Sequence, residues 1–450
     1  MNKETRQTLA RASRFTSPGF DRGWAAQVHM ANRPQDVLSV MLGELWVIFL
    51  AVVLIVGILA DEPWIIAVTV MTGIIAIGAR VWARLALEEV RYSRHVAQRY
   101  LFPGEETELT LTLENRKPIP VPWLHVYDEI PKELQALGVK TVRTERSDSY
   151  RLEDSLSLGW YERVRHRFRI RALHRGHVRI GPAQLEAGDL FGLFRARLEV
   201  RSAETIVIYP NIVPVDDINF LSARPQGDVL SRIRLAEDLS RPSGLREYVP
   251  GDPIKRIDWK VTARLGQPHV RTYDHTADQY LVIMLDAATT VNAWDGFRRP
   301  MLERGVTAAA SIAARADELG YRVGLISNGV PLAGEGQMVI APGADPRQLS
   351  VLLEALAMVR PIAIDPLSRV IGASPRAIPF GSTIIAVSSI FPDSLLIELD
   401  RLSGRGHPVM ALYVGDAEPP RSGGRFQITS EGERFDVPYL EAEDRPSWDD

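Results

Sequence analysis

Two long apolar runs stand near the start of the chain. Residues 45–60 and 64–79 carry no charged side chain, and each reaches about 20 residues with its flanks, the length at which a helix crosses a bilayer. Only residues 61–63 separate the runs. A buried hairpin of a soluble protein and a signal peptide are the alternatives, but the second adjacent run disfavours the former and the long polar lead disfavours the latter. The pattern therefore predicts a two-helix transmembrane hairpin over residues 41–84.

The flanks of this hairpin predict its orientation. Lys and Arg occur in residues 1–40 and again from residue 80 onward, and the short connection has none. Because Lys and Arg favour the cytoplasmic side, we expect both termini and the soluble domains to be cytoplasmic, at the cell (inner or plasma) membrane. Residues 1–40 are expected to form a cytoplasmic N-terminal segment that touches anionic membrane lipid. The basic residues after the second run are Arg80, Arg84, Arg91 and Arg94.

The hydrophobic pattern changes to a period of two after Glu88. Residues 108–113 alternate polar and apolar positions, residues 115–122 are rich in proline, and residues 123–127 resume the alternation. Short alternating segments separated by turns are typical of antiparallel sheets, and they continue to residue 209. The pattern predicts a β-sandwich domain of immunoglobulin-like size over residues 88–212.

One of these alternating segments carries a row of arginines. Residues 162–171 place every second side chain on one face of a strand. This face could be a solvated one that discourages edge pairing, or it could bind anionic lipid or an acidic partner. Nucleic acid is not favoured, because no aromatic side chains alternate with the arginines for stacking. The basic face consists of Arg163, Arg165, Arg167, Arg169 and Arg171.

From residue 280 to residue 414, apolar runs alternate with helical patterns. This order predicts a mostly parallel, doubly wound α/β sheet of Rossmann-like kind over residues 279–415. Ligands of such sheets bind at the carboxyl ends of the strands, and Asp286 follows the first strand. Residues 416–450 are expected to form a C-terminal hairpin, from residue 426 to residue 440, and an acidic tail.

The linker over residues 213–278 contains its densest set of charged and turn-forming residues at 241–264. Pro250 and Gly251 predict a tight turn, and Asp252 is expected to cap a helix that starts at Pro253. The charges have two interpretations. They could form an ion-pair network that fixes the domain junction, or they could receive a partner protein or do acid/base work. The proposed network contains Arg246, Asp252, Asp258 and Arg264.

The same stretch carries a family resemblance. Residues 245–252 read Leu-Arg-Glu-Tyr-Val-Pro-Gly-Asp, and residues 257–264 read Ile-Asp-Trp-Lys-Val-Thr-Ala-Arg. They resemble the signature of the domain of unknown function 58 family, and residues 175–210 are similar to that family's middle region. The resemblance implies a C-terminal von Willebrand A-like domain and a MoxR-type AAA+ ATPase as the partner. The signature residues are Arg246, Tyr248, Gly251, Asp252, Ile257, Asp258, Trp259, Lys260 and Arg264.

The von Willebrand A-like assignment raises the question of a divalent cation. Such domains hold one with a loop that reads Asp-x-Ser-x-Ser, whereas residues 286–290 read Asp-Ala-Ala-Thr-Thr. Ala288 removes one ligand oxygen, and Ser388 stands where a later acidic ligand is usual. Magnesium requires six oxygen ligands, so the sequence predicts no stable metal site. Asp286 and Thr290 remain the candidates for weak cation binding.

Composition excludes several functions. The net charge of -3 gives no general attraction to nucleic acid, and the absence of cysteine excludes thiol chemistry. Common nucleotide, hydrolase and metalloprotease motifs are missing, so no small-molecule substrate is expected. The sequence predicts a non-catalytic, membrane-anchored scaffold. The alternatives are a metal-dependent protein-ligand receptor that uses a degenerate cation site, and an enzyme that uses Asp252 or Asp258.

Overall fold

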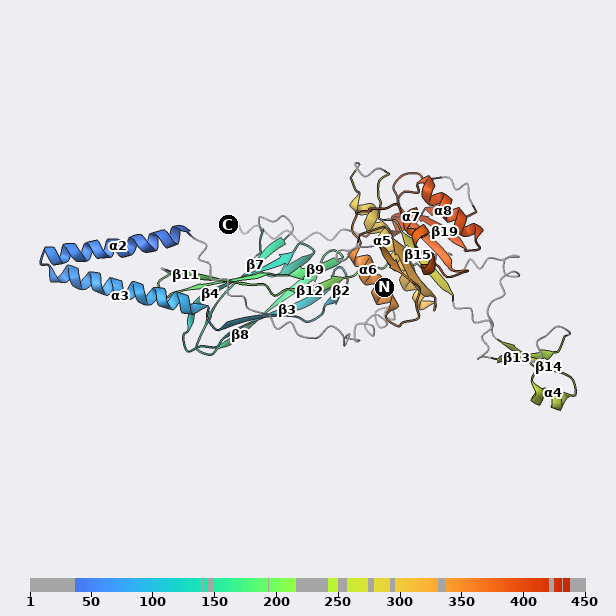
Figure 1. The fold of residues 1–450 in the computed structure, drawn as a ribbon, viewed down its shortest axis with the longest axis horizontal. Coiled ribbons are helices and arrows are strands. Elements are labelled where there is room, and N and C mark those ends of the chain that lie inside the picture. Colours follow the sequence, from blue (N-terminus) through green and yellow to red (C-terminus); the bar gives the residue numbers. More distant parts are fainter. Residues whose placement is uncertain are drawn as a thin grey trace. The chain divides into compact units, whose positions relative to one another are not determined.

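The protein is a mixed α/β protein with several sheets (Figure 1). The computed structural model describes residues 37–139, 141–143, 149–192, 194–215, 242–249, 257–273, 279–291, 296–330, 337–420, 425–430 and 432–437. The chain divides into two compact units near residue 212. Most of the predicted N-terminal segment and of the acidic tail lie outside the described residues, and the predicted domain boundaries stay predictions.

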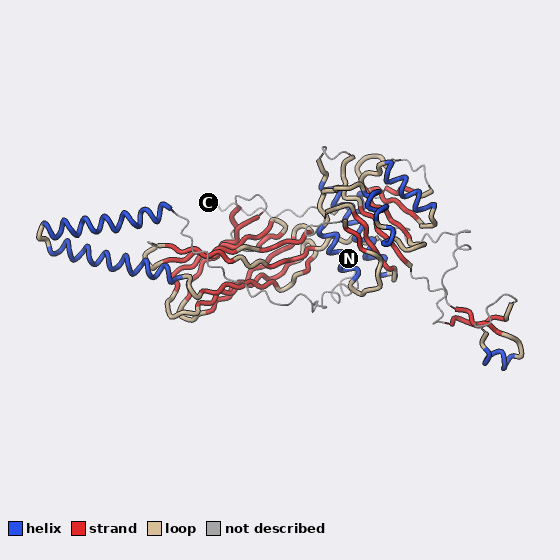
Figure 2. The backbone as a smooth tube through the Cα atoms, in the orientation of Figure 1, coloured by secondary structure: helices blue, strands red, loops and turns tan. Residues whose placement is uncertain are grey.

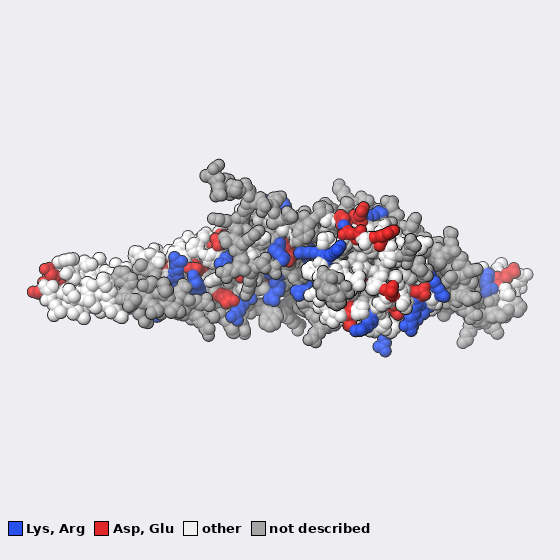
Figure 3. Space-filling model, turned by 90° about the horizontal axis from the view of Figure 1, so that it is seen from above, with Lys and Arg blue, Asp and Glu red and all other residues white. Residues whose placement is uncertain are grey.

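A helical hairpin precedes the first strand. Helix α2 covers Val37–Leu59 and helix α3 covers Pro63–Ala86. Among the described residues, α3 is the helix long and apolar enough to cross a membrane, and its large apolar side chains, such as Ile74 at 66% exposure, face outward. Acidic side chains lie at the tip of the hairpin, and the surface behind them is uncharged (Figure 3). A membrane-length apolar helix is therefore confirmed, and the second span and the orientation stay predictions.

The first unit continues as layered, mostly antiparallel sheets. Their strand orders are β1-β3-β8-β5, β11-β10-β4-β7-β6 and β2-β12-β9. The predicted alternating segments 108–113 and 123–127 fall in β3 and β4, and one core takes Leu111 of β3, Leu124 of β4 and Ile206 of β12. The strands are β1 Val90–Val96, β2 Tyr100–Leu101, β3 Glu106–Asn115, β4 Val121–Pro131, β5 Leu134–Leu137, β6 Thr141–Arg143, β7 Ser149–Leu158, β8 Arg163–Ala172, β9 Gly176–Ile180, β10 Ala183–Gly188, β11 Arg195–Val200 and β12 Glu204–Ile208.

The second unit contains a mostly parallel sheet of order β17-β16-β15-β18-β19-β20, in which β17 alone is antiparallel to its neighbour. The α/β prediction is confirmed at this level. Helices cover both faces of the sheet (Figure 2). The strands are β15 Tyr280–Leu285, β16 Arg322–Ser327, β17 Met338–Ile340, β18 Thr383–Ser388, β19 Val409–Tyr413 and β20 Gln427–Ser430. The helices are α5 Arg299–Glu318, α6 Gln348–Met358, α7 Leu367–Ala373 and α8 Asp393–Gly404, with the 3-10 turns η3 Pro375–Ala377 and η4 Gly432–Phe435.

Packing on the two faces follows the side chains of β15, which alternate between them. Val282 and Met284 pack in one core with residues of α7 and α8. On the other face α5 packs against β15, β16 and β18, and Gly305 permits the close approach, because a Cβ there would lie 3.3 Å from Leu285 Cδ1. Continuous apolar strands of this kind are expected where both faces are covered.

The end of the chain differs from the prediction. Residues 427–430 form β20, which pairs parallel with β19 as an edge strand of the main sheet, so the hairpin predicted after residue 426 is wrong over these residues. The physical reason is burial. Phe426 and Phe435 flank this segment and are both buried, which places the strand between them against the sheet.

Candidate functional site

The family-like signature folds as a small hairpin that carries a helix. Strand β13 pairs antiparallel with strand β14, and helix α4 lies between them in sequence. Two hydrogen bonds close the module: Tyr248 N–H donates to the Pro268 carbonyl, and Asp258 N–H donates to the His269 carbonyl, both at 2.9 Å. The elements are β13 Pro242–Glu247, α4 Trp259–Leu265 and β14 His269–Tyr273.

Asp258 begins the helix. Its Oδ1 accepts from the backbone amides of Lys260 at 3.0 Å and Val261 at 3.2 Å. Ile257 is paired with Val270 in an extended bridge, so the helix predicted to start at Pro253 does not continue through Ile257, and residues 250–256 lie outside the described residues. The backbone is extended at Ile257 and Asp258, and the Asp258 carboxylate caps the helix that follows. The cap predicted at Asp252 lies outside the described residues and stays a prediction.

This geometry predicts a local effect of Asp258→Ala. The substitution removes the acceptor of two amides, and losing an N-cap costs about 1 kcal/mol of helix stability. We expect hydrogen exchange at Lys260 and Val261 to accelerate about fivefold, measured on the full chain by exchange mass spectrometry of residues 257–266. Asp258→Asn keeps a capping oxygen and is the control. Equal protection in the alanine and asparagine variants would show that the cap does not hold the helix.

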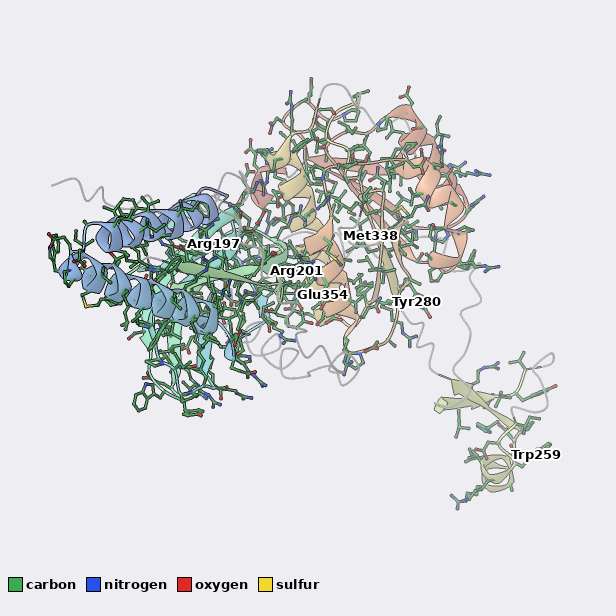
Figure 4. All side chains as sticks on the ribbon, turned by 60° about the vertical axis from the view of Figure 1, so that its left-hand side comes forward. Arg197, Arg201, Trp259, Tyr280, Met338 and Glu354 are labelled. Atoms are coloured by element: carbon green, nitrogen blue, oxygen red, sulfur yellow. The ribbon has the colours of Figure 1, made fainter. Side chains whose placement is uncertain are left out.

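The other signature residues are mostly at the surface. Arg246 donates to the Glu247 carbonyl at 3.2 Å, and Tyr248 is half-buried. Trp259, marked on α4 in Figure 4, is exposed, as are Lys260 and Arg264. Gly251 and Asp252 lie outside the described residues. The ion-pair network predicted to include Asp252 therefore stays a prediction.

A second candidate site lies at the carboxyl ends of the parallel strands. Asp286 follows β15 and is buried, and three donors converge on its carboxylate. Oδ1 accepts from the Ala288 amide at 3.0 Å and from Asn328 Nδ2 at 2.8 Å, and Oδ2 accepts from Ser388 Oγ at 3.2 Å. The side chain thus joins the ends of β15, β16 and β18.

Burial dominates the electrostatics of this carboxylate. It raises the pKa of Asp286 to about 6, because an ionised group loses solvation there, and the three hydrogen bonds offset only part of that effect. A structural acid that ties three strands together explains these contacts. The site is poorly suited to a cation, since both oxygens already accept from protein donors.

Thr290 does not complete a cation site with Asp286. Its hydroxyl donates to the Gly296 carbonyl at 2.7 Å, and the hydroxyl of Thr289 accepts from the Arg298 amide at 2.8 Å. Within the described part of the chain, no three His, Asp or Glu side chains gather in a way that could hold a metal. The residues that are described do not fit the divalent cation of the family-like loop.

Asn328 is the member of this cluster that the sequence did not reveal. Its Oδ1 accepts from the Ala287 amide at 2.8 Å, while Nδ2 also donates to the Asp365 carbonyl at 3.2 Å. A signal was present, because Asn328 directly follows the buried strand β16. The strand-end rule that selected Asp286 could have selected it too.

Exposed apolar side chains border the same strand-end edge. Val291 and Phe297 belong to the loop after β15, and Ile362 and Ile364 belong to the loop after α6. Backbone contacts bring the second loop to this edge, since the Val330 amide donates to the Ile362 carbonyl. All four side chains are exposed, Ile364 at 78%. We call them the strand-end apolar rim.

The basic face of β8 lies against acidic residues of β3. Arg163 pairs with Glu114 at 3.0 Å, and Arg171 pairs with Glu106 at 2.8 Å. Arg165 stands opposite Thr112 in the same register. These exposed pairs contribute little to stability, but they offset much of the positive charge, which favours the solvated-face interpretation. Two further exposed pairs are Arg167 with Glu108 at 3.3 Å and Arg169 with Glu106 at 3.8 Å.

The chain is similar in sequence to proteins of one family. Residues 244–423 match the family model described as "Protein of unknown function DUF58". The uncharacterized protein YeaD of Bacillus subtilis is 22% identical over 294 residues, which is 65% of this chain and 68% of that protein. The uncharacterized protein Rv1480 of Mycobacterium tuberculosis is 36% identical over 96 residues, 21% of this chain and 29% of that protein.

The chain also has a weak similarity to a solved structure. The SpRpn10 VWA domain is 13% identical and has a TM-score of 0.24, with coverage of 34% of this chain and 88% of that domain. A TM-score this low establishes no shared fold.

Proposed function

The chain belongs to the DUF58 family, and from that premise we propose that it is a membrane-anchored, non-catalytic scaffold. In this proposal α2 and α3 form a two-span hairpin with both termini cytoplasmic. They carry an immunoglobulin-like β unit and a von Willebrand A-like α/β unit. The α/β unit docks a protein partner at the carboxyl ends of its strands. The family resemblance makes a MoxR-type AAA+ ATPase that partner.

The strand-end apolar rim carries the proposal. Clustered apolar side chains on a soluble surface are typical of interaction sites, and Phe297 is of the aromatic type that anchors interfaces. The neighbouring carboxylate of Asp286 is engaged by protein donors on both oxygens. Among the described residues, this edge therefore offers a surface for contact, and its buried carboxylate is held by protein donors.

Copurification tests the proposal. The full chain is solubilised in detergent and used to recover the ATPase, with and without nucleotide. Phe297→Asp and Ile364→Asp each place a charge in the rim, so each should lower recovery about tenfold or more, as for a central interface residue. Phe380→Asp is the matched control, since Phe380 is also exposed but stands just before β18, at the amino ends of the parallel strands.

Two results would overturn this proposal. Failure to recover any MoxR-type ATPase in either nucleotide state would remove the partner, and equal losses in the rim and control variants would remove the rim as its site. The metal-dependent receptor alternative needs a cation to replace donors of Asp286. Saturable heat with Mg²⁺ in the wild-type chain, absent from Asp286→Asn, would favour that alternative.

A further inference from the structure

Three turns of the β unit meet at one end of its sheets. The registers place Glu114 opposite Arg163, Leu158 opposite Val121, and Ala187 opposite Leu124. The turns at residues 116–120, 159–162 and 189–192 therefore lie together. Side chains tie them: Asn115 Nδ2 donates to the Gly159 carbonyl at 2.7 Å, and Trp123 Nε1 donates to the Asp189 carbonyl at 3.0 Å.

Helix α3 ends at the same place. The Lys117 ammonium, from the first of these turns, donates to the Ala86 carbonyl at 2.6 Å and to the Glu88 carbonyl at 2.5 Å. Carbonyls at a helix end lack intrahelical donors, so this lysine closes the helix against the β unit. The Tyr161 amide in turn donates to the Lys117 carbonyl at 3.4 Å, which brings the second turn to the helix end.

The third turn lies beside the last two turns of α3, before the helix ends at Ala86. Ala79, Ala83 and Ala86 are buried on one side of α3, and α3 packs there against β10 and β11. The Arg80 guanidinium lies 6.0 Å from the centre of the Phe194 ring. Small side chains at this spacing permit close approach, so Phe194, which follows the third turn, reaches the level of Arg80.

The length of α3 places that level at the membrane boundary. A hydrocarbon core of about 30 Å takes about 20 helical residues. Counted from Pro63, the first residue of α3, the span ends near Trp82. The turn beside Arg80 consequently reaches the boundary itself, and the turn beside Ala86 lies at headgroup depth.

The side chains on these turns suit that depth. Trp160 and Tyr161 are 70% and 67% exposed, and Leu190 and Phe191 are 64% and 67% exposed. Trp and Tyr concentrate at membrane interfaces, because each combines an apolar ring with a polar group. The third turn is also preformed, since Asp189 accepts from the amides of Phe191 at 2.9 Å and Phe194 at 2.7 Å.

We propose that this end of the β unit is seated in the membrane interface. In this arrangement Trp160 and Tyr161 contact lipid headgroups, and Leu190 and Phe191 reach about 5–10 Å into the boundary between headgroups and acyl chains, as interfacial elements do. The occupant of these exposed side chains is the lipid surface, because α3 packs against β10 and β11, the strands that the third turn connects. The inference rests on the proposed membrane anchoring by α3, and it fixes the height of the β unit on the bilayer.

The absence of cysteine allows single reporters on the full chain. Ile74→Cys, Leu190→Cys and Gln98→Cys each receive an environment-sensitive fluorophore, and the protein is placed in phosphatidylcholine and phosphatidylglycerol nanodiscs. Nitroxide lipids then quench at a shallow or a deep position. Ile74 reports the span. Gln98, exposed at the turn after β1, is the control, because the β1–β3 register places that turn at the opposite end of the sheet.

We expect deep nitroxides to quench the Ile74 reporter, shallow nitroxides to quench the Leu190 reporter, and neither to quench the Gln98 reporter. An unquenched Ile74 reporter would overturn the membrane anchor itself. With Ile74 quenched, a Leu190 reporter that behaves like Gln98 would overturn the interfacial seat and leave the anchor standing. A Leu190 reporter shielded from both lipid and aqueous quenchers would show that protein covers the turn, which also overturns it.

Discussion

Replacing Asp128 by alanine is expected to lower the free energy of unfolding of the β unit by about 3–5 kcal/mol. Arg94 and Asp128 form a buried ion pair with side chains 1% and 0% exposed. The pair is bidentate: Arg94 Nε donates to Oδ2 and Nη2 donates to Oδ1, both at 2.8 Å. Removing the carboxylate leaves the guanidinium charged and buried without its counterion, and that desolvation cost accounts for the large effect.

The pair also connects distant parts of the unit. Arg94 Nη1 donates to the Ile180 carbonyl at 2.6 Å and to the Ser202 carbonyl at 3.1 Å, and the Tyr92 hydroxyl donates to Asp128 Oδ2 at 2.6 Å. The buried ion pair therefore connects four segments by hydrogen bonds: β1, β4, β9 and the residues before β12. Asp128→Ala should therefore lower the stability of the whole β unit and not only that of the strand β4.

Hydrogen exchange of the β3 and β4 amides in the full chain measures this effect within one unit, because opening of core strands reports the stability of their own cooperative unit. A loss of about 3–5 kcal/mol corresponds to exchange that is about 10²–10⁴ times faster. Arg167→Ala is the matched control: it breaks an exposed pair with Glu108 and should cost about 0–1 kcal/mol. Equal effects of Asp128→Ala and Arg167→Ala would contradict a stabilising role for the buried pair.

Arg94 shows why part of the structure was not predictable from sequence. The sequence places it among the basic residues that flank the membrane hairpin, yet the alternation of β1 turns it inward with Tyr92. Its partner Asp128 lies 34 residues away on another sheet. Local patterns do not contain such a pairing, which depends on how the sheets stack.

Elements with a strong local pattern were predictable. The apolar runs became α3, β15 and β18, and the alternating segment 108–113 became β3. Sites that depend on non-local geometry were predicted less well. The position after a strand identifies Asp286 but does not reveal its partner Asn328. The motif groups Thr290 with Asp286, although the Thr290 hydroxyl donates a hydrogen bond to the Gly296 carbonyl. The cap at Asp258 was also missed, because it depends on the pairing of Ile257 with Val270, which lies 13 residues further along the chain.

Asp286→Asn is expected to stabilise the α/β unit at neutral pH. Burial raises the pKa of Asp286 to about 6, whereas an unfolded aspartate has a pKa of about 3.9. Below about pH 4 both states are protonated, so the group has no effect on stability. As pH rises toward about 6, the unfolded state loses its proton first, and stability falls by about 3 kcal/mol in total. Above that pH both states are ionised and the penalty stays constant.

Asparagine suits the site because it removes the charge and keeps the contacts. Its Oδ1 can accept from the Ala288 amide and Asn328, and its Nδ2 can donate to Ser388 Oγ, which now donates to Asp286. The variant should therefore match the wild type near pH 4 and exceed its stability by about 3 kcal/mol at pH 8. Exchange of the β15 and β18 amides, corrected for intrinsic rates, measures the difference.

Asp345→Asn is the control for this pH dependence, since it neutralises a carboxylate on an exposed loop and keeps an oxygen for the Arg347 amide. It should follow the wild type at every pH. The opposite result is equally informative: an Asp286→Asn variant that is less stable at pH 8 would mean that the folded protein needs the ionised carboxylate. Stabilisation of the wild type alone by Mg²⁺ would then identify a cation as the reason, because a ligand that binds only the folded state raises its stability by mass action.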